Sequence, residues 1–295
     1  TPRQSRLGVR IKSDAAHSPA GSIEVDFWGL RGSGRSGSLQ TAPRLRRAFL
    51  ELDFNELDLL AGQDWIAPAP LNPTSIMHVA IVGMMNSGNL WGRAPQIRGS
   101  WMAVADENQA VKLDLALARP IANDATMTPV EQGDVLGAGE RYGWPAIQGR
   151  AGYSIKGSTA LSVGLGGTYC RMDFGDDPAG DDNFGTSHFI AGDAALTAGR
   201  LTFQGEAYVG ENIGGYSSNA GYVLVADSMR VDGVWSRYSR FEGIQATGGW
   251  GEVKLAVTPV VDVAVNAGME SVDDEFLGNG AVKSNFTVMG NVIHK

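Results

Sequence analysis

Apolar and polar side chains alternate with a period of two along almost all of this 295-residue chain. Successive side chains of a β-strand point to opposite faces, so the alternation is typical of strands with one apolar and one polar face. Clear examples are the segments 6–12, 23–27, 111–117 and 261–270. An amphipathic helix repeats about every 3.6 residues instead. The pattern therefore predicts an all-β fold.

The alternation divides the chain into thirteen predicted strands with two kinds of connection between them. The strands begin near residues 4, 21, 43, 56, 95, 109, 145, 159, 184, 201, 243, 260 and 282, and most are long enough to reach the ~9–11 residues that cross a bilayer at a tilt. Short connections at 13–20, 54–55, 106–108, 156–158, 198–200 and around Pro259 alternate with long ones at 30–42, 66–94, 121–144, 175–183, 210–242 and 272–281. Transmembrane β-barrels have tight turns on one side of the membrane and long loops on the other. We therefore expect a transmembrane antiparallel β-barrel.

The strand order predicts one barrel domain over residues 1–295, with strands missing at both ends. The first strand begins at the long-loop end, so at least one strand is expected before Thr1. An even total then needs either no further strand or a hairpin after Lys295, which gives about 14 or 16 strands.

A break in the alternation falls within the third strand. Arg44 and Arg46 share one face with Leu45 opposite, but beyond Arg46 the pattern is inverted, so that Arg47 faces away from Ala48. One extra residue in the strand has this effect, and the sequence predicts a β-bulge near Arg46.

Composition and motifs exclude several functional classes. The 24 Lys and Arg against 32 Asp and Glu, with a pI near 5.0, argue against nucleic-acid binding. Cys170 is the single cysteine, the four histidines are far apart, and no GxSxG is present, so we expect no metal, no cofactor and no enzymatic activity. The GxGxxG at 32–37 has no helix or parallel strand after it, and the acidic run 176–182 lacks calcium-loop spacing. We interpret both as outer loops.

The polar face of the predicted strands carries too many charges for a packed protein core. Burying so many charges without water would cost several kcal/mol each, whereas a water-filled lumen hydrates them. Four of these residues, Arg10, Arg46, Arg98 and Arg150, lie three to six positions inside the long-loop ends of their strands. An arginine ladder of this kind would attract carboxylates or phosphates. The alternative interpretation is that these arginines pair with Asp26, Glu51 and Asp114.

The connection 66–94 is the longest one with substantial apolar content. Ser75 is a candidate cap for a short helix that includes Ile76 and Met84 and ends at Gly88. A long apolar loop is unfavourable in water, so we expect it to fold into the lumen as a constriction. A contact with another subunit is the alternative.

Five segments resemble, in order, the DcaP-like porins, which belong to the trimeric 16-stranded outer-membrane porins. They are RQSRLGVRIK (3–12), SIEVDFWG (22–29), RLRRAFLELD (44–53), LLAGQDW (59–65) and RAPQIRGSW (93–101), and the likeness covers roughly residues 3–105. The resemblance implies a homotrimer in the outer membrane of a Gram-negative bacterium, in contact with lipid and lipopolysaccharide. It also implies passive diffusion of small, anionic solutes, with Arg44, Arg46, Gln63, Asp64 and Arg98 near the constriction. It favours 16 strands over 14.

Three other functions remain open at this stage. A barrel with a plugged lumen would serve as a structural or surface-binding protein and would not conduct. An outer-membrane enzyme would need a cluster of Ser, His and Asp side chains, and no such cluster can be picked out. A soluble β-rich binding protein would dissolve without detergent.

Overall fold

The computed structural model describes residues 5–29, 42–75, 83–121, 136–176, 179–217, 223–273 and 282–294. Within them, thirteen strands form one antiparallel sheet in which each strand pairs with the next in the order β1 to β10, then β13, β14 and β15. The strands are β1 (Arg6–Lys12), β2 (Ala20–Gly29), β3 (Ala42–Asp53), β4 (Leu57–Trp65), β5 (Arg93–Ala105), β6 (Gln109–Ala118), β7 (Ala146–Ile155), β8 (Thr159–Asp176), β9 (Asp182–Ala198), β10 (Leu201–Glu211), β13 (Gln245–Thr258), β14 (Val261–Val272) and β15 (Ser284–His294). The all-β prediction is confirmed, and every predicted strand starts within two residues of an observed one.

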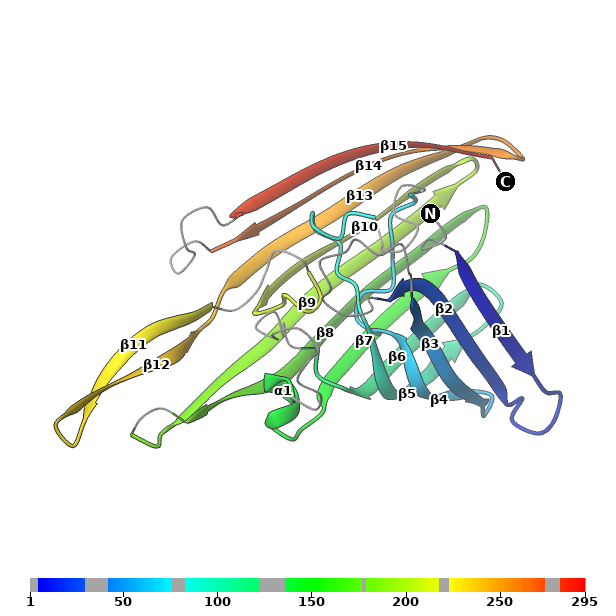
Figure 1. Cartoon of the computed structure of the whole chain (residues 1–295). Helices are drawn as coiled ribbons and strands as arrows, with labels where there is room; N and C mark the ends of the chain where they lie inside the picture. Colours follow the sequence, from blue (N-terminus) through cyan, green and yellow to red (C-terminus); the bar gives the residue numbers. More distant parts are fainter. Residues whose placement is uncertain are drawn as a thin grey trace.

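A two-stranded hairpin lies outside this sheet. β11 (Val223–Val231) and β12 (Val234–Glu242) pair only with each other, and Figure 1 shows them extending beyond the sheet at the long-loop end. The prediction of the stretch 210–242 as a plain loop was therefore wrong. The turn of the hairpin is formed by Asp232 and Gly233, both at positive φ, a conformation that matches the twist of paired strands.

Strand length decides how far the sheet extends. β8 has 18 residues and β9 has 17, well beyond the ~9–11 needed to cross a bilayer. These two strands therefore project past the others at the long-loop end (Figure 1). The short helix α1 (Ala138–Arg141) packs against β8 there. No helix in the described residues is long and apolar enough to cross a membrane.

The two faces of the sheet differ as the alternation predicts. Large apolar side chains are exposed on the convex face, among them Leu50 (68%), Leu115 (62%) and Phe286 (65%). The sheet curves around the connection between β4 and β5, which lies on its concave side (Figure 1). We call this concave side the lumen side. Most of the buried charged side chains lie on it, and the apolar convex face is suited to lipid.

Some sequence-based expectations fall on residues outside the described ones. These are the GxGxxG motif at 32–37, part of the acidic run 176–182, and residues 76–82 of the expected helix. The described end of that expected helix, residues 83–88, forms a turn. Met84 there has a φ of 56°, and Gly88 has a φ of 92°. The prediction of a helix that includes Met84 was therefore wrong.

Candidate functional site: the lumen wall and its constriction

The predicted β-bulge is present at Arg46 and places three arginines on the lumen side. Glu24 pairs with Arg47 and Val25 with Leu45, so Arg46 is the extra residue of β3. The extra residue shifts the alternation, and Arg44, Arg46 and Arg47 all point inward as a result. Gln63 supports the bulge from β4, because its amide donates to the carbonyls of Leu45 and Arg46, each at 3.1 Å.

Arg44 and Arg46 share the carboxylate of Asp26 in β2. Arg46 donates to Asp26 Oδ2 at 2.9 Å and to Glu24 Oε1 at 2.5 Å, and Arg44 donates to Asp26 at 2.6 Å. The side chains of Arg46 and Asp26 are 2% and 0% exposed. Arg46 is therefore a buried part of the wall, and Arg44, with 31% of its side chain exposed, is accessible from the lumen.

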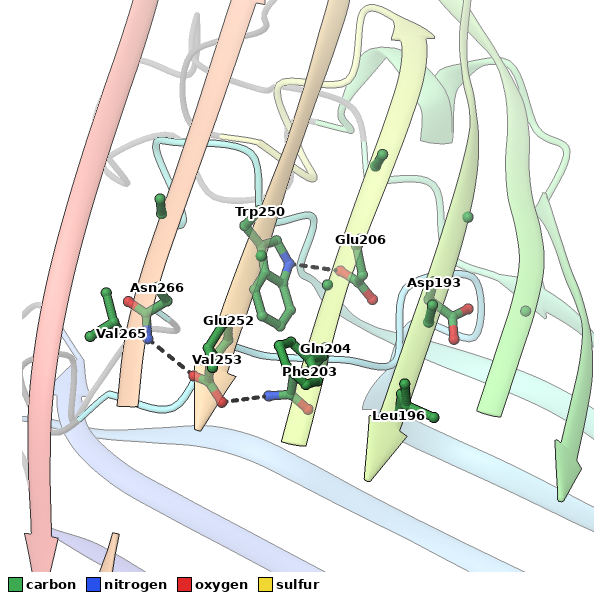
Figure 2. Close-up of a pocket in the computed structure, with 17 residues that line it drawn as sticks. Asp193, Leu196, Phe203, Gln204, Glu206, Trp250, Glu252, Val253, Val265 and Asn266 are labelled. Carbon is green, nitrogen blue, oxygen red and sulfur yellow. Dashed lines mark hydrogen bonds between the residues drawn. The ribbon is translucent and has the colours of Figure 1, made fainter. Parts of the chain in front are cut away.

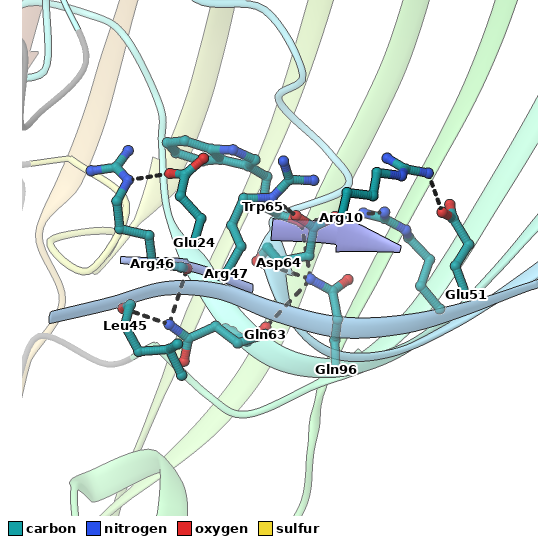
Figure 3. A network of polar contacts seen from close by, with 12 residues as sticks. Arg10, Glu24, Leu45, Arg46, Arg47, Glu51, Gln63, Asp64, Trp65 and Gln96 are labelled. Carbon is teal, nitrogen blue, oxygen red and sulfur yellow. Dashed lines mark hydrogen bonds and ion pairs between the residues drawn. The ribbon is translucent and has the colours of Figure 1, made fainter. Parts of the chain in front are cut away.

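Asp64 at the end of β4 bridges two more arginines. Its Oδ1 accepts from Arg47 Nε at 2.6 Å and its Oδ2 from Arg98 Nη2 at 3.0 Å. Figure 3 shows Arg46, Arg47, Asp64 and Trp65 on one side of the β3 ribbon, and Gln63 with Leu45 on the other side. Two arginines on one carboxylate give the cluster a net positive charge, and both arginines are partly exposed.

The remaining predicted arginines, Arg10 and Arg150, are each paired with a carboxylate, but only Arg10 has a partner that the alternative interpretation named. Arg10 donates to Glu51 Oε2 at 2.9 Å (Figure 3). Arg150 binds the carboxylate of Asp193 through two bonds of 2.8 and 2.7 Å, a partner on β9 that the sequence did not indicate. Asp114 pairs with Lys112 at 2.9 Å. These residues therefore do not form a row of unpaired arginines.

The connection between β4 and β5, residues 66–92, folds against the opposite wall of the lumen, and we call it the constriction loop. The backbone N–H of Leu71 donates to Glu206 at 2.9 Å. The N–H and hydroxyl of Thr74 donate to Glu252 at 2.6 and 2.8 Å. Figure 2 shows Glu206 and Glu252 on neighbouring strands, where Trp250 also donates to Glu206. The predicted inward fold is present in the described parts of the loop.

Two further contacts hold the second half of the constriction loop. Ser87 bonds to Thr287 through their hydroxyls at 2.7 Å, and Asn285 donates to the carbonyl of Asn86 at 2.8 Å. Both partners belong to β15. The loop therefore spans β10, β13 and β15, which is the side away from the arginines.

This arrangement separates the two kinds of charge in the lumen. The constriction loop covers Glu206 and Glu252, which are 6% and 3% exposed. A cavity of about 300 Å³ lies between the loop and the arginine side. It is lined in part by Asp64, Arg98, Lys112, Asp114 and Arg150, together with the loop residues Ile66, Ala67, Ala69, Pro70 and Asn72. The space that remains beside the loop thus runs along the basic wall.

Sequence reasoning missed a second segment that folds inward, residues 212–217 after β10. Ile213 and Tyr216 are completely buried in a cluster with Ile66 and Leu90 of the constriction loop. Two large apolar side chains in a stretch otherwise rich in Gly, Asn and Ser were the signal that could have identified it. As for other ligands, no three His, Cys, Asp or Glu side chains gather as a metal site in the described ranges.

Comparison with known proteins gives structural matches only. No model of a known protein family matches the chain, and no curated protein sequence does. The outer-membrane channel DcaP of Acinetobacter baumannii is similar in structure, with a TM-score of 0.68 and 17% identity over 99% of this chain and 74% of that one. OmpT of Vibrio cholerae (TM-score 0.49, 11% identity, 98% and 80% covered) and OprB of Pseudomonas putida (0.46, 13%, 98% and 86%) match less well.

The structural similarity to DcaP and the sequence resemblance over residues 3–105 point to the same fold. The structural similarity extends over nearly the whole chain, including the region after residue 105 in which only the strand rhythm was informative. The chain has the fold of the DcaP-like outer-membrane porins.

Proposed function

We propose that this protein is a porin of the Gram-negative outer membrane through which small hydrophilic, anionic solutes diffuse passively. The fold of an outer-membrane channel supports this proposal, and so does a convex face of exposed leucine, isoleucine, valine and phenylalanine side chains. The opposite face of the sheet, on the lumen side, is charged and therefore suits a water-filled channel. Contact with lipid and lipopolysaccharide and assembly as a homotrimer are parts of the same proposal.

The anion preference rests on one observation, the position of the constriction loop. The loop lies on Glu206 and Glu252 and leaves the passage beside Arg98 and beside Asp64, the carboxylate that Arg47 also binds. Interaction between charges falls with distance, so a passing ion interacts more strongly with the arginines than with the covered glutamates. Because Arg47 and Arg98 share the single carboxylate of Asp64, their charge is only partly neutralised. Narrow pores with such residues favour anions.

The test removes the positive charges of Arg47 and Arg98 and leaves the buried ion pairs of the β3 bulge intact. Arg46 is unsuitable because it is buried in the bulge, so we choose Arg47→Gln with Arg98→Gln. Glutamine still donates hydrogen bonds, which limits the cost of leaving the buried Asp64 without its partners. Arg230→Gln is the control, because Arg230 is exposed on the hairpin and donates to the carbonyl of Gly233.

The expected result is a lower chloride-to-potassium permeability ratio in the double variant and an unchanged ratio in the control, measured from reversal potentials in planar bilayers. An unchanged ratio in the double variant would remove these arginines from the selectivity filter. The alternative function is a non-conducting barrel with a structural or surface-binding role. The buried cluster around Tyr216, which fills part of the lumen side, favours it, and absence of conductance from verified, folded barrels would support it.

A further inference from the structure

The segment 212–217 reverses direction directly after β10 and is fixed at that point by Asn212. This residue has a φ of 54°, and its N–H donates to the carbonyl of Ile244 at 2.9 Å. Its side-chain oxygen accepts from the N–H of Ile244 at 2.9 Å, and its amide donates to the carbonyl of Thr186 at 2.7 Å. Asn212 is fully buried. The reversal is thus bonded to β9 and to the residue directly before β13, which are on the two sides of β10, and the residues after it are directed onto the lumen side.

Tyr216 in this segment contacts both ends of the constriction loop. Its carbonyl accepts from the N–H of Trp91 at 3.0 Å. Its ring lies edge-on to Phe189 of β9 at 5.1 Å and belongs to the same buried cluster as Ile66 and Leu90. Ile66 begins the loop and Leu90 lies near its end, so one aromatic ring packs where the two ends of the loop come together.

The end of the segment is held by a carboxylate of the wall. Ser217 and Tyr208 both donate their hydroxyl hydrogens to Glu270 Oε2. Glu270 is 1% exposed and belongs to β14. The segment is therefore attached at its start by Asn212 and at its end by Ser217, and Tyr216 is positioned between rigid supports.

We propose that residues 212–217 are a second constriction element and that Tyr216 is a positioning residue which holds the two ends of the constriction loop. The middle of that loop is bonded to Glu206 and Glu252, and its two ends are held together by a hydrogen bond from the N–H of Ile66 to the carbonyl of Gly92 at 3.1 Å and by the packing around Tyr216. Removal of the ring leaves a void in a close-packed cluster, and the loop ends gain freedom to move. The width of the passage is then no longer fixed. This inference rests on the proposed function for its effect on transport, and the positioning itself does not depend on conduction.

The experiment compares Tyr216→Ala with Tyr216→Phe and with Phe203→Ala. Tyr216→Phe keeps the ring and removes only the hydroxyl, which bonds to Thr168 at 3.4 Å. Phe203→Ala removes a ring of equal size from β10, but from the exposed convex face (43% exposed). All variants are made in the full chain and checked for folding by heat-dependent migration on gels. If Tyr216→Ala does not fold, Tyr216→Leu takes its place, because leucine retains part of the apolar volume.

The first readout is independent of conduction. Ala69→Cys places a thiol in the same cluster, where Ala69 is 7% exposed, and the rate of its reaction with a water-soluble maleimide reports local opening. The native Cys170 is 1% exposed and is replaced by serine as a precaution. We expect labelling about tenfold faster with Tyr216→Ala than with Tyr216, and no change with Tyr216→Phe or Phe203→Ala. Equal labelling in all backgrounds would overturn the proposal.

The second readout is the size of solute admitted. Vesicle-swelling rates with neutral sugars of increasing size, and single-channel conductance, are expected to rise with Tyr216→Ala and to stay unchanged with the other two variants. If the unsubstituted protein conducts and Tyr216→Ala has the same conductance and size limit, the segment is not a constriction element. If the unsubstituted protein does not conduct, the proposed function fails, and faster labelling would still support the positioning role of Tyr216.

Discussion

Leu115 in β6 provides a quantitative test of which face of the sheet meets lipid. It is 62% exposed on the convex face, and its neighbours in register are Gly99 on one side and Gly149 on the other. A larger side chain therefore meets no side chain directly opposite it on either neighbouring strand. Leu115 is the seventh residue of β6, so at ~3.3 Å per residue and a tilt of about 40° it lies about 15 Å from the short-turn end of the strand. This depth is close to the middle of an apolar band about 25 Å tall.

An arginine at this depth is expected to cost about 2–4 kcal/mol in the free energy of unfolding, compared with alanine at the same position. The comparison is Leu115→Arg against Leu115→Ala, measured by guanidinium unfolding in phospholipid vesicles with linear extrapolation. Val111→Arg against Val111→Ala is the depth control. Val111 is the third residue of the same strand and lies on the same face, near the short-turn end, so the expected cost falls to about 0–1 kcal/mol. Equal costs at the two positions, or no cost at Leu115, would refute the assignment of this face to lipid.

Three further perturbations test the loop, its attachment and the hairpin. Deletion of residues 70–90 is expected to increase single-channel conductance, and an unchanged conductance would show that the loop does not narrow the passage. Glu252→Leu removes the acceptor of both Thr74 donors and one of the two acceptors of the Asn266 amide, which keeps its bond to the carbonyl of Thr74. It is expected to lower the free energy of unfolding by about 1–3 kcal/mol, with Glu252→Gln costing less; equal stabilities of the two variants would contradict the role of the carboxylate. Replacement of residues 223–242 by a short glycine–serine linker is expected to leave conductance and heat-dependent gel migration unchanged, because the hairpin pairs with no strand of the main sheet; loss of the folded band would contradict this.

The strands and the bulge were predictable because each leaves a direct trace in the sequence. Alternation with a period of two records which side chains face lipid and which face water, and both environments are continuous along every strand. The extra residue at Arg46 inverts that alternation, so the bulge appears in the sequence at the same position as in the structure. The hairpin β11–β12 also left a trace, since Asp232 and Gly233 form a typical hairpin turn between alternating residues. Reading the whole stretch as a loop overlooked it.

The pairing of charges was predictable only in part. Glu51 and Asp26 were candidate partners because they share the lumen side with the arginines, and they bind Arg10 and Arg46. The pairing of Arg150 with Asp193 joins β7 to β9 across β8, and it depends on glycine at position 164. A Cβ at that position would lie 2.2 Å from Arg150 Nη2. Such a contact between strands that are not neighbours has no signature in the alternation.

The role of Gln63 differs from the one that the resemblance implied. Its amide bonds to the backbone of β3 at the bulge, and it supports the wall that carries the arginines. The inward fold of residues 66–92 was predictable from their apolar content, but the wall against which they lie was not. That choice depends on buried glutamates, Glu206 and Glu252, which accept hydrogen bonds from the loop backbone.

The central claim is that a constriction loop on the acidic wall leaves an anion-selective passage beside the arginines. Single-channel recording of the full-length protein in a planar bilayer, with the reversal potential measured under a KCl gradient, tests it most directly. The account predicts discrete conductance steps with a reversal potential displaced toward that of chloride. Discrete steps with a reversal potential displaced toward that of potassium would contradict the selectivity argument, and folded barrels without conductance would contradict the channel itself.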